Sequence, residues 1–119
     1  MESEAIKAIL SLCQHTQWHL IISQITQFEI ANTPDDSRRK ALELMIANAN
    51  MIIEINEAIH QRAKKLELSG IKAFDAMHLA CAETQADVLL TVDDKFLKKA
   101  KTLTTLKVDN PLKWLEEVL

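Results

Sequence analysis

The sequence predicts an α/β fold, with a mostly parallel sheet between two layers of helices. Two observations predict it. Short apolar runs alternate along the chain with segments of helical periodicity, which is the order of elements in a parallel sheet. These runs are apolar at nearly every residue, as expected of strands that helices cover on both faces. With 119 residues, the chain has the length of one domain, and we expect residues 1–119 to form a single unit.

The first elements are predicted from an apolar stripe and a cap. A helix is expected from about Ser3 to His15, with an apolar face made of Ile6, Ile9, Leu10 and Cys13. A short strand, Trp18 to Ile22, follows it. Ser23 can then cap a helix that runs through Asn32, because its hydroxyl can accept a bond from the first turn.

In the middle of the chain, capping residues mark where helices are expected to start and end. A helix start is predicted at Thr33-Pro34-Asp35-Asp36, which supplies a cap, a proline at the first helical position and acids in the first turn. The helix that follows includes Leu42, Met45, Ile46 and Ala49. Met51 to Ile55 is a second strand candidate. Asn56 can cap the next helix, whose apolar face is made of Ile59, Ala63 and Leu66. Gly70, the only glycine, is expected to end this helix.

The C-terminal part repeats this alternation. A helix is predicted for Ile71 to Thr84, a strand for Val88 to Val92 and a helix for Asp94 to Leu103. A brief strand at Leu106 to Val108 and a segment capped by Asn110-Pro111 complete the chain. In such a sheet, ligands bind beyond the carboxyl ends of the strands, so the segments that begin at Ser23, Asn56 and Asp93 are the places to search.

Composition excludes several classes of function. One glycine cannot supply the Gly-rich phosphate loops of Walker-type NTPases and Rossmann dehydrogenases. A net charge of −3 gives no general attraction to nucleic acid, and five aromatic residues without a tyrosine argue against a base-stacking platform. The acidic N-terminus and the lack of a long apolar run predict a cytoplasmic protein that does not enter a membrane.

Three acids stand out, and each also has a purely structural explanation. Asp75 falls in the middle of the apolar stripe of its helix, where a buried carboxylate needs a cation, a metal or several hydrogen-bond donors; a structural salt bridge would also satisfy it. Asp93 ends an apolar strand and is equally suited to capping the next helix. Glu29 lies on the helix after the first strand and is otherwise an exposed acid. Asp94, beside Asp93, is an alternative acid.

The remaining candidates are polar and basic side chains. His78 lies about 60° from Asp75 on the same helix, where it can carry protons or support an acid, or bond to backbone within the core. Ser23 can join a polar site or act only as a cap. Lys95, Lys98 and Lys99 belong to a lysine-rich segment that either steers a phosphate chain or is a solvated face. Cys13 and Cys81 fit buried hydrophobic positions in a reducing compartment.

Two segments resemble the PIN-domain family closely. FDAMHLA at 74–80 matches its pattern D-A-x-H-L-A, and the apolar strand that follows closes in T-x-D-x-x-F through Thr91, Asp93 and Phe96. Upstream, LIIS at 20–23 followed by FEI at 28–30 looks like the family's strand, serine and helix with its acid. The resemblance covers the chain from its first helix onward and implies a three-layer α/β/α architecture.

PIN domains are Mg²⁺- or Mn²⁺-dependent nucleases, and many are VapC-like ribonuclease toxins of toxin-antitoxin pairs. The resemblance therefore implies that Glu29, Asp75 and Asp93 are catalytic metal ligands, with Asp94 able to assist or substitute. It also implies an RNA substrate and an antitoxin protein as a partner. Hard divalent cations prefer oxygen ligands, which agrees with an acidic site. Ser23, Lys95, Lys98 and Lys99 are the substrate-binding candidates.

The chain departs from the family pattern at its start. That pattern begins with a strand that bears another acid and lies centrally in the strand order 3-2-1-4-5, whereas residues 1–119 begin at the first helix. We therefore expect a shortened domain with weakened metal binding, and self-association through exposed strand edges. Two other functions stay open: an inactive relative that binds RNA, an antitoxin-like peptide or its own copy, and a receiver-like switch that uses Asp93 or Asp94.

Overall fold

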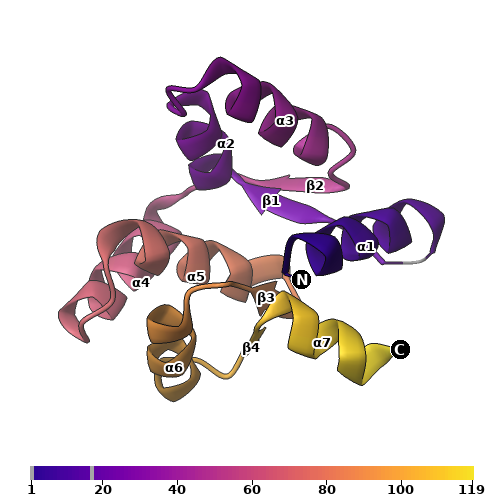
Figure 1. Ribbon diagram of the computed structural model, residues 1–119. Coiled ribbons are helices and arrows are strands. Elements are labelled where there is room, and N and C mark those ends of the chain that lie inside the picture. The colour runs from indigo at the N-terminus through magenta and orange to yellow at the C-terminus, as the bar shows by residue number, and fades with distance from the viewer. Residues whose placement is uncertain (1, 17) are drawn as a thin grey trace.

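The computed structural model describes residues 2–16 and 18–119. Within these residues lie seven helices and four strands (Figure 1). In chain order they are α1 (Glu2–His15), β1 (Ile21–Ser23), α2 (Gln24–Ala31), α3 (Asp36–Ile46), β2 (Met51–Ile53), α4 (Glu57–Leu68), α5 (Ala73–Gln85), β3 (Val88–Leu90), α6 (Asp94–Leu103), β4 (Lys107–Asp109) and α7 (Pro111–Val118). The predicted α/β class and the alternation of elements are confirmed.

Most helices begin where the sequence places a cap. The Ser23 hydroxyl accepts a hydrogen bond from the Thr26 N–H (3.4 Å), and the Asn56 side chain accepts one from the Ile59 N–H (2.9 Å). Asn110 caps α7 in the same way, through the Leu112 N–H at 2.9 Å. These side chains satisfy N–H groups of the first turn that have no partner within the helix.

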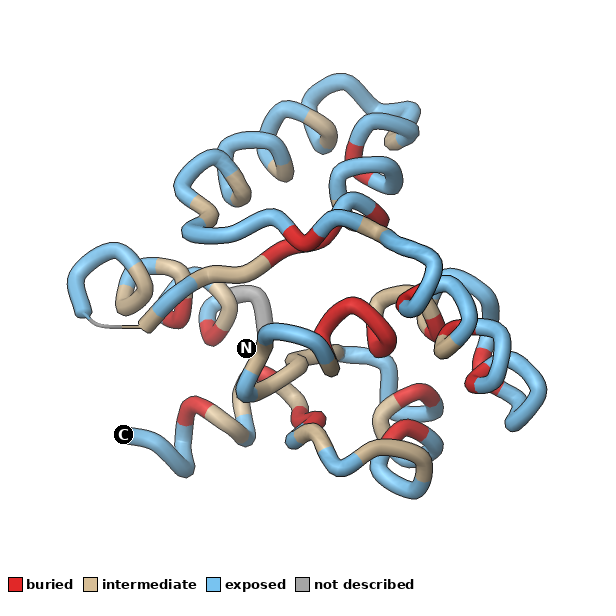
Figure 2. The backbone as a smooth tube through the Cα atoms, turned by 180° about the vertical axis from the view of Figure 1, so that it is seen from behind, coloured by how far each residue is buried: buried red, intermediate tan, exposed pale blue. Residues whose placement is uncertain are grey.

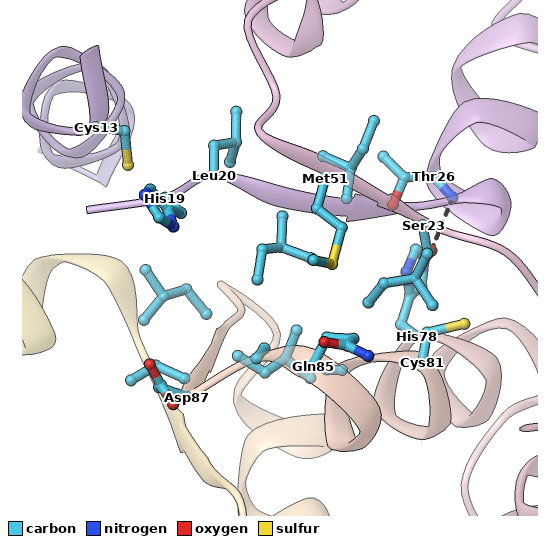
Figure 3. A pocket seen from close by; sticks show the side chains of 18 of the residues that line it. Cys13, His19, Leu20, Ser23, Thr26, Met51, His78, Cys81, Gln85 and Asp87 are labelled. Atoms are coloured by element: carbon cyan, nitrogen blue, oxygen red, sulfur yellow. Dashed lines mark hydrogen bonds between the residues drawn. The ribbon is translucent and has the colours of Figure 1, made fainter. Parts of the chain in front are cut away.

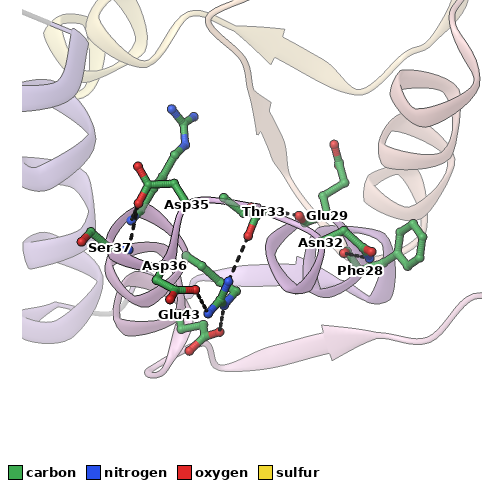
Figure 4. A network of polar contacts seen from close by, with 10 residues as sticks. Phe28, Glu29, Asn32, Thr33, Asp35, Asp36, Ser37 and Glu43 are labelled. Atoms are coloured by element: carbon green, nitrogen blue, oxygen red, sulfur yellow. Dashed lines mark hydrogen bonds and ion pairs between the residues drawn. The ribbon is translucent and has the colours of Figure 1, made fainter.

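Helix α3 begins later than predicted. Its cap is Asp35, whose Oδ1 accepts hydrogen bonds from the N–H groups of Ser37 (2.9 Å) and Arg38 (3.2 Å). Pro34 therefore precedes the helix instead of occupying its first turn. Thr33 is engaged elsewhere, because its hydroxyl donates to the carbonyl oxygen of Glu29 (3.1 Å) at the end of α2. Figure 4 shows this connection between α2 and α3.

The lone glycine ends α4, as predicted. Gly70 has a φ of 99°, a left-handed conformation that other residues rarely adopt, and its N–H donates to the Glu67 carbonyl (2.9 Å). The Ile71 N–H still bonds to the Leu66 carbonyl (3.2 Å), so the residue belongs to the end of α4. For this reason, α5 begins at Ala73 and not at Ile71.

The strands are parallel but form two separate pairs. In the described part of the chain, β1 pairs with β2 and β3 pairs with β4, and no ladder joins one pair to the other. The predicted parallel direction is confirmed, and the division of the sheet is a feature that the sequence did not reveal. Each strand is three residues long, and its bounds differ by up to three residues from those predicted, because a strand extends only as far as its neighbour lies alongside.

Two clusters of buried apolar residues hold the layers together. The main one lies where α4 and α5 pack against each other and against β2, α6 and β4, with Leu66 and Leu79 at its centre. The second joins α1 to α7 through Ala5, Ile9 and Leu115. Figure 2 colours the buried stretches of these elements red, whereas α3 is largely exposed. Among the described helices, none is long and apolar enough to cross a membrane.

Candidate functional site

The three acids singled out by the sequence lie on different elements, and Asp75 is close enough to the other two for their charges to act on it. Glu29 lies on α2, which leaves the end of β1, and Asp93 caps α6 shortly after the end of β3. Asp75 lies in the first turn of α5. The carboxyl ends of parallel strands meet at one edge of a sheet, which is the usual place for a site in α/β proteins.

The pKa of Asp75 is affected by the charges of both other acids. Burial raises the pKa of the Asp75 carboxyl above its ordinary value, and the negative charges of Asp93 and Glu29 raise it further. The positive charges of His78 and Lys72 act in the opposite direction without cancelling the rise. Asp75 is half-buried, so the fully buried carboxylate expected from the stripe is only partly observed. A cation placed among these acids would relieve their repulsion.

His78 supports one of these acids directly. Its Nε2 contacts the Oε1 of Glu29, which joins α5 to α2 across the site. Of the two explanations for this histidine, support of an acid agrees with the structure, and a bond to core backbone is not the contact observed. Figure 4 shows the Glu29 side chain extending away from the α2–α3 connection, whereas its carbonyl accepts the bond from Thr33.

Asp93 has the capping role that its position suggested. Its Oδ1 accepts the N–H of Phe96 (3.1 Å), and its own N–H donates to the Thr91 hydroxyl (3.1 Å). The residue is nevertheless exposed and close enough to Asp75 to raise the pKa of that carboxyl. Asp93 can therefore cap α6 and belong to the acid group at the same time. Asp94 is the exposed first residue of α6.

The acid group has the right chemistry for a hard cation but an open arrangement. Carboxylate oxygens are the ligands that Mg²⁺ and Mn²⁺ prefer. Among the described residues, however, no three His, Cys, Asp or Glu side chains are already grouped so that they could hold an ion together. Glu29, Asp75 and Asp93 thus fit a divalent cation by donor type, but their arrangement does not enclose one.

Ser23 lies deeper than the acids. Only 5% of its surface is exposed, and it lines a cavity shown in Figure 3 together with His78 and Cys81. Burial raises the pKa of the Cys81 thiol, and a hydrogen bond with Ser23 offsets part of this rise. Cys81 is therefore a protonated, buried side chain at neutral pH, as expected, whereas Cys13 is only partly buried; both are free thiols.

The lysines predicted to bind substrate are exposed on α6. Lys95 follows Asp94 at the start of the helix, and Lys98 lies one turn further on. Lys99 lies over Gly70, where a β-carbon on residue 70 would collide with its Nζ. Its charge thus lies near the C-terminal end of α4, where the partial negative charge of the helix favours a cation.

Sequence reasoning missed two other groups. Arg62 on α4 forms a two-pronged ion pair with Glu83 on α5, through Nε–Oε1 at 2.8 Å and Nη2–Oε2 at 3.0 Å. Phe28 and Phe74 pack together with ring centroids 6.1 Å apart, although each is about half exposed (53% and 50%). The contact with Phe28 therefore covers the ring of Phe74 only in part.

A family model now connects this arrangement to known proteins. The model of the PIN domain matches residues 3–102, which is most of the chain and includes all the candidate acids. The chain belongs to the PIN-domain family. PIN domains are nuclease-type domains and are generally metal-dependent. The receiver-like alternative is thereby replaced by the PIN assignment. A search among curated proteins finds no match to the chain.

Proposed function

We propose that this PIN domain is an endoribonuclease that depends on Mg²⁺ or Mn²⁺ and cleaves RNA phosphodiester bonds. The observation that supports the proposal most is the pKa of Asp75, which the carboxylates of Asp93 and Glu29 raise together. Asp75 is thus close enough to both Asp93 and Glu29 for their negative charges to act on it. Such a group is unfavourable in the empty protein and becomes favourable when a cation is bound.

In this proposal Glu29, Asp75 and Asp93 hold the ion, and Asp94 assists from the next position. The chemistry that a divalent ion supplies here is the activation of water and the stabilisation of charge in an in-line displacement at phosphorus. His78 is a positioning residue, because its contact with Glu29 fixes the direction of that carboxylate. The cap formed by Asp93 restrains this second carboxylate at the start of α6.

The substrate is proposed to approach along α6. Lys95 and Lys98 are exposed on α6, the helix that Asp93 caps, and would attract the phosphate chain, with Lys99 adding charge from its place over Gly70. Ser23 would contact the substrate or its water from within the cavity. Cations along one helix can localise RNA near an otherwise acidic site without making the whole protein basic.

The biological setting is proposed by family resemblance. Residues 1–119 would act as one PIN-like unit, a VapC-like toxin of the cytoplasm whose partner is an antitoxin protein. Its two free thiols suit a reducing compartment. α3 and β2 also expose the apolar side chains of Leu44, Met45 and Ile52, which would suit an antitoxin or a second copy in a homo-oligomer.

Cleavage of a labelled single-stranded RNA tests the nuclease proposal. We expect activity with Mn²⁺ or Mg²⁺, none in chelator, and a loss of at least about 100-fold in Asp75→Asn, which removes a ligand charge. Asp87→Asn is the matched control, because Asp87 is an exposed aspartate just before β3, away from the carboxyl ends of the strands. Equal activity of Asp75→Asn and Asp87→Asn would refute the assignment of the site.

The second candidate is an inactive PIN relative that binds RNA, an antitoxin-like peptide or itself. It is favoured by the open arrangement of the acids, since no three candidate ligands within the described ranges are already grouped for an ion. Fluorescence anisotropy of the same RNA separates the two functions. Binding that is unaffected by Mn²⁺ and by Asp75→Asn, without metal-dependent cleavage, would support the inactive relative.

A further inference from the structure

Two phenylalanines form an exposed aromatic pair between α2 and α5. The rings of Phe28 and Phe74 have centroids 6.1 Å apart, and their planes are inclined by 33°. About half of each side chain is exposed to solvent, whereas Phe96, the third phenylalanine of the chain, is buried in the main apolar cluster. Phenylalanine is usually among the more buried residue types, so the placement of this pair needs an explanation.

The aromatic pair lies beside the acid group. Phe28 directly precedes Glu29 in α2, and Phe74 directly precedes Asp75 in α5. Glu29 also contacts His78, which lies about 6 Å further along α5 than Phe74. Residues four apart share one face of a helix, so a single face of α5 meets α2 at both contacts. The aromatic pair therefore borders the acids at the N-terminal end of α5.

The exposed area of the pair fits a small flat ligand better than a protein. An aromatic side chain has roughly 150–250 Å² of surface, so two half-exposed rings leave about 200 Å² open to solvent. A stable protein interface covers about 800 Å² on each partner. Scattered exposed apolar residues are common, but these two lie together and each adjoins an acid. Their open surface matches one planar ring system.

Positive charges lie near the same acids. Lys72 is exposed at the start of α5, and its charge acts to lower the pKa of Asp75. The interaction between the charges of Asp75 and Asp93 shows that α5 and α6 begin close together, and α6 carries Lys95 and Lys98. A ligand on the aromatic pair thus has cations within its reach. A nucleotide combines the two features required, a flat neutral base and a negative phosphate.

We propose that Phe28 and Phe74 form a binding site for one unpaired base of an RNA strand. The inference rests on the proposed function, because it places this base next to the phosphate on which the acids act. The base stacks on the outer surface of the pair, since rings 6.1 Å apart are already in contact and leave no gap between them. Only a base that is free of a double helix offers its face in this way, so the site selects single-stranded RNA.

The site accepts one base and discriminates little among bases. The two tryptophans, Trp18 and Trp114, pack against each other in the cluster between α1 and α7, so they do not extend the aromatic pair. Stacking is tolerant of sequence because every base has an aromatic face. A neutral base also tolerates the neighbouring carboxylates of Glu29 and Asp75, which would repel a phosphate in the same place. The pair therefore distinguishes unpaired from paired RNA.

The three phenylalanines report on base binding directly. In chelator, AMP should shift the ring resonances of Phe28 and Phe74 in NMR spectra and saturate at millimolar concentration, whereas those of buried Phe96 should not move. Ribose phosphate, which keeps the sugar and phosphate but lacks the base, should bind at least about tenfold more weakly. Equal binding of AMP and ribose phosphate would overturn the proposal, and so would unshifted rings of Phe28 and Phe74.

A comparison of single-stranded with duplex RNA tests the selectivity. In chelator, the protein should bind a labelled single strand at least about tenfold more tightly than the same strand annealed to its complement. Phe74→Ala should lose most of this preference, whereas Phe74→Tyr, which keeps the ring, should retain it. Leu44→Ala removes an exposed apolar side chain from α3 and should behave as the parent does. Equal preferences in Phe74→Ala and Leu44→Ala would contradict the proposed base site.

These measurements separate the base site from the nuclease proposal, because both are made without metal. Ring shifts on AMP in a protein that never cleaves RNA would support the base site and refute only the nuclease. Metal-dependent cleavage without ring shifts would refute only the base site. Shifts of Phe28 and Phe74 that grow with protein concentration in the absence of AMP would assign the aromatic pair to a contact between copies, and would also overturn the proposal.

Discussion

The imidazole Nε2 of His78 contacts the carboxylate Oε1 of Glu29, two residues separated by 49 positions in the sequence. The contact joins the first half of α5 to the helix that leaves β1. It thereby holds one acid of the group in place, because a carboxylate bonded to a ring nitrogen has fewer orientations available.

This contact predicts a role for His78 in metal binding. Supporting partners of metal ligands typically contribute about 10- to 100-fold in affinity, and we expect a loss of about tenfold in Mn²⁺ affinity for His78→Ala. His78→Gln, which keeps a donor, should retain part of that affinity. Titration calorimetry provides the measurement, with His60→Ala on the exposed face of α4 as the control. An unchanged affinity in His78→Ala would leave the contact with a purely structural role.

Asp75 should destabilise the metal-free protein at neutral pH. Burial and the charges of Asp93 and Glu29 raise its pKa, so the folded state binds the proton more tightly than the unfolded state does. The favourable contribution is thus present below the unfolded pKa of about 3.9 and is lost as the pH rises through the raised pKa. Asp75→Asn should therefore be more stable at pH 7 by about 0.5 kcal/mol, allowing for solvent screening.

Thermal melts in chelator check this sign. The difference between Asp75→Asn and the parent should disappear below about pH 4, where the parent carboxyl is also neutral. Asp87→Asn serves as the control for loss of one exposed charge. A midpoint lowered by several degrees in Asp75→Asn would instead identify Asp75 as half of a structural ion pair.

Glu83 should show the opposite pH dependence. Burial alone would raise its pKa, but hydrogen bonds from Arg62 and Thr104 and the charge of Arg62 lower it below the ordinary value. The stabilisation is therefore present above the unfolded pKa of about 4.3 and is lost as the pH falls through the lowered pKa. We expect Glu83→Gln to cost about 1 kcal/mol at pH 7, since the pair is partly exposed.

Urea unfolding at two pH values measures this effect. The cost of Glu83→Gln should shrink on acidification to about pH 3, and Glu67→Gln, an exposed glutamate on α4, should be nearly neutral throughout. A cost that does not change with pH would mean that the network acts through packing and not through the charge of Glu83.

Although the chain has too few aromatic residues for an extended base-stacking platform, its two exposed phenylalanines should contribute to RNA binding if the acid group acts on RNA. Phe28 and Phe74 directly precede Glu29 and Asp75 in the sequence, and their half-exposed rings offer faces on which a base can stack. Stacking on an aromatic ring contributes about 1–3 kcal/mol per base, so Phe74→Ala should weaken RNA binding by about tenfold or more. Anisotropy with an abasic oligonucleotide is the control, and an equal loss for both ligands would contradict stacking.

Much of the local structure was predictable because its causes are local. The caps at Ser23, Asn56 and Asn110 and the end of α4 at Gly70 depend on residues within one helical turn. The parallel direction of the strands follows from the alternation of apolar runs and helices. The start of α3 was misplaced because the Thr33 hydroxyl bonds to the end of the preceding helix, a choice that the sequence pattern leaves open.

The sequence by itself determined the α/β class and the apolar faces of the helices, because periodicity encodes them directly, and its resemblance to the PIN family singled out the candidate acids. Only the tertiary structure decided that His78 meets Glu29, that Arg62 meets Glu83 and that β1 and β3 face each other across a cavity. These relationships depend on how helices and strands distant in sequence are oriented once they pack. The shapes of the buried side chains and the pairing of the strand edges jointly set that orientation. A local stretch of sequence therefore does not determine it.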